Sequence, residues 1–231
     1  MFSLSPLEIE AVQLSLKVSL WAVAISLPFG IAVAWVLARC EFPGKPLFDA
    51  LIHLPLVVPP VVIGYLLLIL LGRNGAVGGF LYETFGVTVA FSWQGAAVAA
   101  AVMAFPLMVR AIRLSIEAID TRLEQAARTL GAGPIDVFFS VTLPLAGSGI
   151  VVGVILAFAR ALGEFGATIT FVSAIPGETT TLPVALYGLA QVPGKEGSAI
   201  RLVILSIVIA FAAMFISEVI ARRVRRRISG A

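Results

Sequence analysis

The sequence predicts an all-α integral membrane protein with about five transmembrane helices. Hydrophobic residues make up 60% of its 231 residues and charged residues only 13%, and the mean hydropathy is +1.06. Soluble domains carry about a quarter charged residues, so a soluble fold is excluded. The longest polar stretches are loops. We therefore expect residues 1–231 to form one transmembrane domain.

Five apolar stretches are long enough to cross the hydrocarbon core, which takes about 20 residues. They span residues 12–37, 47–71, 91–109, 145–171 and 200–220, and the second contains Pro55, Pro59, Pro60 and Gly64. Prolines remove backbone hydrogen bonds and bend a helix. The second stretch is therefore either a kinked packing helix or a helix beside a moving pathway. The outer connections have room for short helices, which the sequence does not decide.

The placement of lysine and arginine predicts the orientation in the membrane, because cytoplasmic loops carry an excess of both. Eleven lie after the first, third and fifth stretches: Arg39, Lys45, Arg110, Arg113, Arg122, Arg128, Arg222, Arg223, Arg225, Arg226 and Arg227. Three lie on the opposite side: Arg73, Lys195 and Arg201. We expect the N-terminus outside and the C-terminus in the cytoplasm. The terminal arginine cluster either binds anionic membrane lipid or only stops the fifth span.

A polar loop at about residues 115–144 separates the third and fourth stretches. Thr121 and Glu124 have the spacing of a capping box, which predicts a helix that begins at Thr121. The apolar stripe of this helix consists of Leu123, Ala126, Ala127 and Leu130. Gly131 is placed to end it in a left-handed conformation, and Gly133-Pro134 begins a second short helix. The loop is predicted to be a helix–turn–helix that a partner binds, or else an interfacial helix without one.

This loop resembles the cytoplasmic coupling loop of bacterial ATP-binding-cassette (ABC) importer permeases, the EAA loop. The positions that match the family pattern are Ala126, Ala127, Gly131, Leu143 and Pro144. Gln125 stands in place of the family's glutamate and Val141 in place of its isoleucine. The resemblance implies a type I ABC importer permease fold, with a loop that docks on a separate ATPase.

The sequence lacks the residues that catalysis or cofactor binding would require. Cys40 is the one cysteine and His53 the one histidine, which excludes an internal disulfide and clusters of cysteine or histidine around a metal. The sequence contains no phosphate-binding loop, so we expect neither an enzyme nor a cofactor site. We expect His53 to be a hydrogen-bonded residue at a helix end. The net charge of +3 does not suggest nucleic-acid binding.

Arg160 and Glu164 form a charged pair inside the fourth stretch. Arg160 lies ~15 residues along it, about 22 Å into the membrane at 1.5 Å per residue. Charges at such depth are costly and mark function or pair with each other. The i,i+4 spacing places both residues on one helical face, which Thr168 extends as a polar position. The pair either contacts a translocated anion or holds the fourth span in place.

Three further segments resemble the permease subunit of bacterial molybdate transporters: residues 35–45, 53–65 and 162–178. Residues 163–167 alone are shared with sulfate and thiosulfate permeases. The resemblance implies a homodimer in the bacterial inner membrane, two ATPase subunits that bind ATP and Mg, and a periplasmic oxyanion-binding protein. The alternatives are a permease for sulfate, thiosulfate or tungstate, and, in a different class, a membrane channel or anchor.

Overall fold

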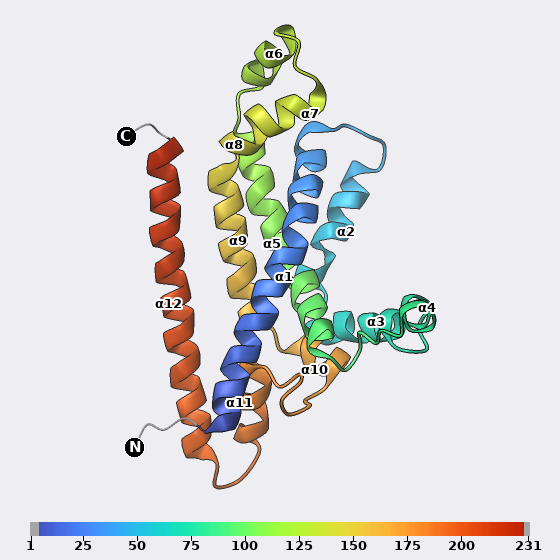
Figure 1. The fold of residues 1–231 in the computed structure, drawn as a ribbon, viewed down its shortest axis with the longest axis vertical. Coiled ribbons are helices and arrows are strands. Elements are labelled where there is room, and N and C mark those ends of the chain that lie inside the picture. Colours follow the sequence, from blue (N-terminus) through green and yellow to red (C-terminus); the bar gives the residue numbers. More distant parts are fainter. Residues whose placement is uncertain (1–4, 229–231) are drawn as a thin grey trace.

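The computed structural model describes residues 5–228, leaving aside the side chains of residues 217, 218 and 220–228. Throughout this part of the chain the regular elements are helices, and Figure 1 shows the longest of them roughly aligned. Three helices are long and apolar enough to cross a membrane. Two pairs of consecutive helices, each bent at a short break, raise the number to five if each pair is one span. The predicted all-α membrane fold is confirmed.

The core is formed by α1 (Pro6–Arg39), α5 (Trp93–Glu117) and α9 (Gly147–Leu162), with α5 packed along both of the others. The buried face of α5 is rich in small side chains: Ala96, Ala97, Ala99, Ala100 and Ala104. Small residues let helix backbones approach closely, which drives helix association in lipid. The start of α1 is fixed by a capping box in which Ser5 and Glu8 bond each other's backbone N–H.

The second predicted span is broken into α2 (Lys45–Val57) and α3 (Pro60–Leu71), which meet at an angle of 113°. A residue before proline is forced out of the helical conformation. Val58 precedes Pro59, and Pro59 precedes Pro60; their ψ angles are 137° and 133°. The two prolines therefore produce a corner rather than the kink that the sequence predicted. Helix α4 (Ala76–Phe85) follows α3 in the connection to α5.

The fourth predicted span is also broken, because α9 ends at Leu162 and α10 (Gly166–Val172) begins after three residues. Helix α10 packs against α3. A Cβ at Gly64 would lie 2.6 Å from the carbonyl oxygen of Ala167, so the two helices touch through glycine. The broken second and fourth spans thus meet each other through α3 and α10.

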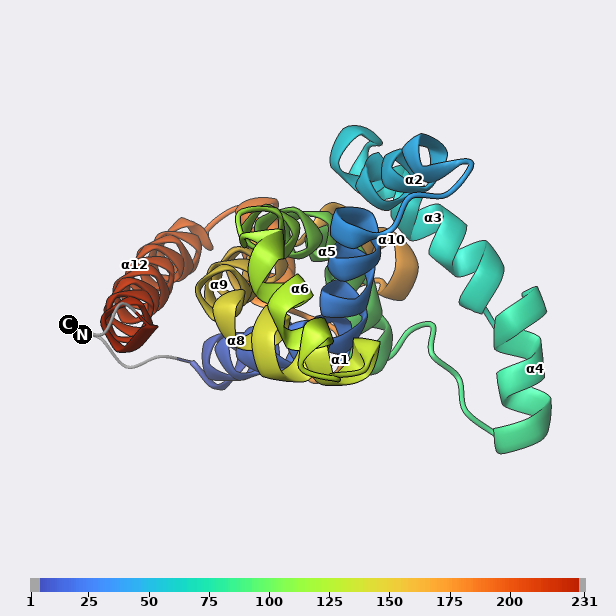
Figure 2. The ribbon, with the colours of Figure 1, turned by 90° about the horizontal axis from the view of Figure 1, so that it is seen from above.

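The chain closes with α11 (Leu182–Ala190) and α12 (Glu196–Ile228). Near the starts of α1 and α12, Glu8 and Arg201 form an ion pair of 3.1 Å. Figure 2 shows α12 and the α2–α3–α4 segment on opposite sides of the core. Only 6% of the most apolar stretch of α12 is buried, against 61% for α5. Arg222–Arg227 are predicted either to bind anionic lipid or only to stop the fifth span, and their side chains lie outside the described residues.

Candidate functional site

The loop between α5 and α9 contains α6 (Thr121–Thr129), α7 (Pro134–Val137), a π-helical turn at Phe138–Thr142 and α8 (Leu143–Leu145). Figure 1 shows α6 and α7 beyond the ends of the core helices. The N-cap of α6 is Asp120, whose side chain accepts a hydrogen bond of 2.9 Å from the backbone of Arg122. The predicted capping box at Thr121 is therefore wrong, because the preceding aspartate, an equally good cap, takes that position.

Gly131 ends α6 in the left-handed conformation, with φ = +91°, as predicted. The backbone N–H of Gly131 donates to Arg128, and that of Ala132 donates to Ala127. This pair of hydrogen bonds is a Schellman motif, which satisfies the last carbonyls of a helix. A Cβ at Gly131 would meet nothing within 4 Å. The requirement for glycine here is therefore conformational and not steric.

Glu124 is buried beneath α6 instead of capping it. Its carboxylate accepts hydrogen bonds from Arg39 Nε at 3.1 Å and from Thr142 Oγ1 at 2.9 Å. Arg39, at the end of α1, also donates to the carbonyl of Ile119 at 3.3 Å. These contacts tie the loop to the end of α1. The sequence carries no local signal for them, because Arg39 and Glu124 are 85 residues apart.

Although the loop also exposes charged residues such as Arg122, Arg128 and Asp136, part of its surface is apolar. Four side chains form this surface, here called the loop patch, with these exposed fractions: Leu123 50%, Leu130 88%, Ile135 73% and Phe139 61%. Gln125 and Ala126 are also exposed, and Ala127 and Leu143 are half-buried. Gly133 is the N-cap of α7, and Pro144 lies within α8. Large apolar residues exposed together mark a surface for another protein or for lipid.

The second candidate region lies at the break between α9 and α10. Arg160 Nη1 is 2.6 Å from Glu164 Oε2, and Glu164 Oε1 accepts a hydrogen bond of 2.8 Å from the backbone of Ala167. The predicted pair forms, but the prediction of a shared helical face is wrong: Glu164 stands in the break and caps α10. The Glu164 side chain is 2% exposed and that of Arg160 is 27% exposed. Each carboxylate oxygen thus has a donor.

The other predicted path residues surround this break. Pro60 on α3 lies against Gly166, the first residue of α10, where a Cβ would come within 2.8 Å of the proline ring. Thr168 is buried on α10, and Pro59 is exposed at the corner between α2 and α3. The structure therefore brings together residues from two broken spans that are distant in sequence.

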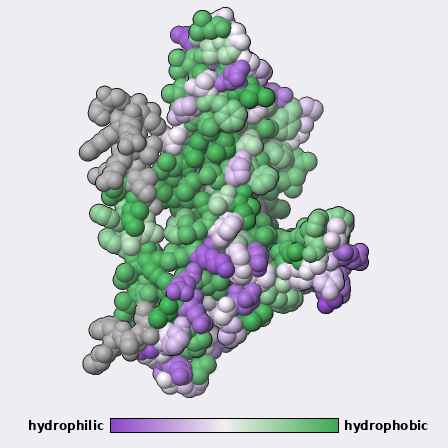
Figure 3. All heavy atoms as spheres, viewed as in Figure 1, coloured by the Kyte–Doolittle hydropathy of each residue, from purple (hydrophilic) through white to green (hydrophobic). Residues whose placement is uncertain are grey.

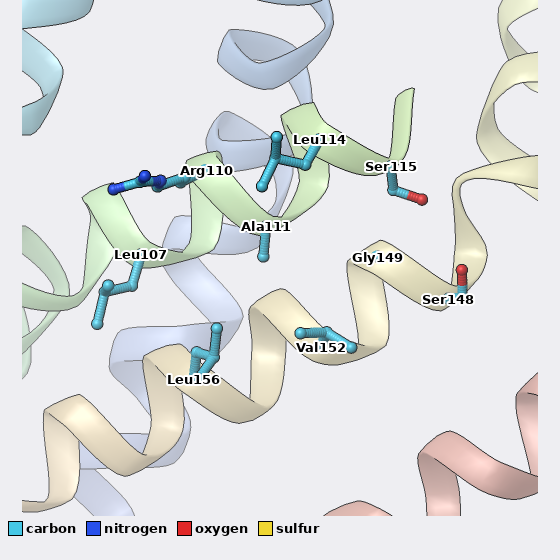
Figure 4. A pocket seen from close by; sticks show the side chains of 9 residues that line it. All are labelled: Leu107, Arg110, Ala111, Leu114, Ser115, Ser148, Gly149, Val152 and Leu156. Atoms are coloured by element: carbon cyan, nitrogen blue, oxygen red, sulfur yellow. The ribbon is translucent and has the colours of Figure 1, made fainter. Parts of the chain in front are cut away.

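A third feature, which the sequence did not predict, is an open groove of about 610 Å³ between α5 and α9. Figure 4 shows the side chains that line it, and they are mostly apolar or small: Leu107, Arg110, Ala111, Leu114, Ser115, Ser148, Gly149, Val152 and Leu156. Arg110 is the charged member. It was counted among the loop arginines, whereas it belongs to the last third of α5.

Among the described residues, no group of three or more histidine, cysteine, aspartate or glutamate side chains could hold a metal. His53 lies inside α2 and not at a helix end; its Nδ1 is 2.9 Å from the carbonyl oxygen of Asp49. Asp49 also pairs with Arg113 at 3.0 Å.

Figure 3 shows hydrophobic side chains over most of the middle of one face and hydrophilic ones gathered in its lower part and over α4.

The chain is similar to known transport proteins along nearly its whole length. It is 64% identical over 220 residues to the molybdenum transport system permease protein ModB of Escherichia coli K12, covering 95% of this chain and 96% of that protein. It is 54% identical to ModB of Haemophilus influenzae, covering 96% and 97%. The sulfate transport system permease protein CysW of Synechocystis is 37% identical, covering 86% and 73%.

Solved structures show the same fold at low identity. A bacterial ABC transporter involved in alginate import has a TM-score of 0.74 at 18% identity, covering 95% of this chain and 80% of that chain. The MetNI methionine ABC transporter has a TM-score of 0.68 at 18% identity, covering 94% of both. Residues 26–226 match the family described as the binding-protein-dependent transport system inner membrane component. The chain belongs to this family of transporter permeases.

Proposed function

We propose that the chain is the permease subunit of an ATP-driven importer for molybdate. The observation that carries this proposal is the 64% identity to the E. coli molybdenum permease over 95% of the chain. At that identity over nearly the full length, the two proteins share one fold. The subunit would form the translocation path and would couple it to ATP hydrolysis in a separate subunit.

The loop patch is the proposed docking surface for a cytoplasmic ABC ATPase subunit. Its four apolar side chains project from a loop whose base is held by the Arg39–Glu124 ion pair. A partner that moves this loop would also move the ends of α1, α5 and α9. ATP and Mg would be bound by two copies of that ATPase, and this chain would need no cofactor of its own.

The proposed assembly contains two copies of the permease in the bacterial inner membrane, with a periplasmic oxyanion-binding protein on the outer side. The distribution of lysine and arginine, ten against three once Arg110 is assigned to the groove between α5 and α9, supports an outer N-terminus and a cytoplasmic C-terminus. The sparse packing of α12 supports a protein neighbour along this helix.

The second candidate function is a permease for sulfate, thiosulfate or tungstate. It is favoured by the 37% identity to the Synechocystis sulfate permease. Sulfate and molybdate are both tetrahedral dianions, so a path that admits one has the charge and shape to admit the other. The higher identity to molybdenum permeases places molybdate first.

The test is uptake by the complex of permease, ATPase and binding protein reconstituted in vesicles, with molybdate, tungstate and sulfate compared side by side. We expect ATP-dependent uptake of molybdate, with sulfate transported at a much lower rate. A preference for sulfate would contradict the substrate assignment, and uptake without ATP would contradict the importer assignment.

A further inference from the structure

The groove between α5 and α9 contains an arginine whose charge no described side chain neutralises. Arg110 has no carboxylate within 4 Å among the side chains that the structure describes. Arg160 and Arg201, in contrast, each pair with a buried glutamate. Arg110 is exposed at the groove surface, on the side of α5 away from α1 (Figure 4). A free positive charge inside a membrane domain calls for an explanation.

The direction of the Arg110 side chain argues against contact with the lipid surface. The Cα of this residue lies seven residues before Glu117, about 10 Å from the cytoplasmic end of α5 at 1.5 Å per residue. Arginines that serve lipid headgroups extend toward the nearer membrane surface. Figure 4 shows the guanidinium leaning the other way, along α5 toward Leu107 and away from Ser115 and Ser148. A lone cation directed into hydrocarbon is costly, so this face must border water or protein.

The groove is placed where the proposed ATPase would act. Its two walls, α5 and α9, are the helices that the docking loop connects. Any movement of the loop relative to the core changes the distance between these walls. Three of the residues that line the groove near its cytoplasmic end are small: the serines Ser115 and Ser148, and Gly149. These features suit the inner part of a path that opens and closes.

We propose that this groove lines the inner half of the anion path and that Arg110 contacts the passing tetrahedral oxyanion. This inference rests on the proposed function, since it needs an oxyanion substrate and a second copy of the chain. Two copies related by a two-fold axis would present two guanidinium groups, which match the charge of a dianion. Guanidinium N–H groups bond such oxygens in pairs. The hydroxyls of Ser115 and Ser148 supply further donors along the exit.

The groove suits transport because contact with Arg110 would be weak. The side chain is exposed to the groove and therefore hydrated, so an anion that binds it gains less than in a dry pocket. Arg160 is a poorer candidate for the same role, because Glu164 cancels its charge. The two arginines thus differ in function: Arg160 holds α9 to α10, and Arg110 meets the substrate.

The first test uses uptake by the reconstituted complex with Arg110→Gln and Arg110→Lys. We expect Arg110→Gln to lower molybdate uptake by about tenfold or more, the effect of one lost charge-assisted hydrogen bond, while ATPase co-purification is unchanged. Arg110→Lys should restore part of the rate. Arg73→Gln is the matched control, since it removes an exposed outer arginine that rests on Tyr82. Normal uptake by Arg110→Gln would overturn the proposal.

The second test includes a labelling step that does not depend on the substrate. Cys40 is the only cysteine, so Cys40→Ser provides a background in which Arg110→Cys is the single thiol. We expect a membrane-impermeant thiosulfonate reagent, added from the cytoplasmic side, to label this thiol. Labelling with a reagent that carries an ammonium group should restore uptake, whereas labelling with one that carries a sulfonate group should not. An unlabelled thiol would overturn the proposal even if no oxyanion were transported. Failure of the Cys40→Ser parent to transport any oxyanion, with the thiol labelled, would instead overturn the proposed function.

The third test separates the substrate from a lipid phosphate as the ligand of Arg110. Uptake by the Cys40→Ser parent and by Arg110→Gln is compared in vesicles with anionic and with purely zwitterionic phospholipid. We expect the difference between the two proteins to persist in both. If zwitterionic lipid lowers the parent to the rate of Arg110→Gln, the arginine serves lipid and the proposal is overturned.

Discussion

At the scale of single residues, Gly131 and the Arg160–Glu164 pair show how local geometry limits substitution. Gly131 has φ = +91° with empty space around its Cα, whereas Gly133 two residues later has φ = −70°. A side chain is strained only at the first position. The Glu164 carboxylate is buried with a donor on each oxygen. Its partner cannot be removed without leaving a buried charge.

Gly131→Val is predicted to reduce coupling while the protein still inserts. The left-handed backbone costs a β-branched residue about 1–2 kcal/mol, which shifts the loop patch relative to the core. The measurement is the ratio of molybdate uptake to ATP hydrolysis in the reconstituted complex, which should fall. Gly133→Ala, where a Cβ would have an ordinary neighbour at 3.4 Å, should behave as the parent. Equal ratios for Gly131→Val and the parent would refute the prediction.

Arg160→Met is predicted to impair assembly, because it leaves Glu164 buried without its cation, a loss of roughly 3 kcal/mol or more. Adding Glu164→Gln should restore much of the yield and the uptake, since glutamine still accepts from the backbone of Ala167. Yield and thermal midpoint in detergent, followed by uptake, are the measurements. A double variant that assembles but does not transport would show that Arg160 acts on the anion.

At the scale of elements, the contact between α3 and α10 depends on glycine. Gly64→Val is predicted to separate the two helices, because its Cβ alone would lie 2.6 Å from the oxygen and 2.9 Å from the Cα of Ala167. Overpacking of this kind costs about 1–3 kcal/mol. A lower thermal midpoint is the expected result. Gly188→Ala, with no neighbour within 4 Å, is the control, and equal midpoints for both variants would contradict the account.

The sequence predicted correctly those helix ends that are determined by residues close by in the chain. Gly131 and Pro134 occupy the predicted ends of α6 and α7 because C-capping glycine and first-turn proline act within a few residues. The N-cap was assigned one residue late, since Asp120 and Thr121 are both good caps. The corner at Pro59-Pro60 was predicted only as a kink, because its 113° angle also depends on how α3 packs against α10.

The contacts that the sequence did not reveal join distant segments. Glu124 has the spacing of a capping residue, yet its partners are Arg39 and Thr142. Arg110 was counted as a loop residue because the apolar stretch ends at position 109, although α5 continues to Glu117. Both cases follow from tertiary packing, which decides whether a charged residue near a span end faces solvent, a partner or a groove.

At the scale of the whole molecule, the orientation is testable by reporter fusions. Fusions after Gly79 and Gly194 are predicted to report the outside, and fusions after Gly44 and Gly133 the cytoplasm. The prediction follows from the excess of lysine and arginine in the connections at one end of the spans. A periplasmic signal from the Gly133 fusion would place the loop patch away from ATP and would contradict the coupling assignment as well.

The central claim is that the loop between α5 and α9 is the surface on which a separate ATPase docks. The most direct measurement is cross-linking in the assembled complex, with a single cysteine introduced at Thr129 in the Cys40→Ser background. Thr129 is exposed at the end of α6, beside the loop patch. We predict a cross-link to the ATPase from Thr129→Cys and none from Gln191→Cys. Gln191 is the C-cap of α11, a helix that lies at the opposite end of the molecule from α6 (Figure 1). A cross-link from Gln191→Cys, or its absence from Thr129→Cys in a complex that transports, would contradict the account.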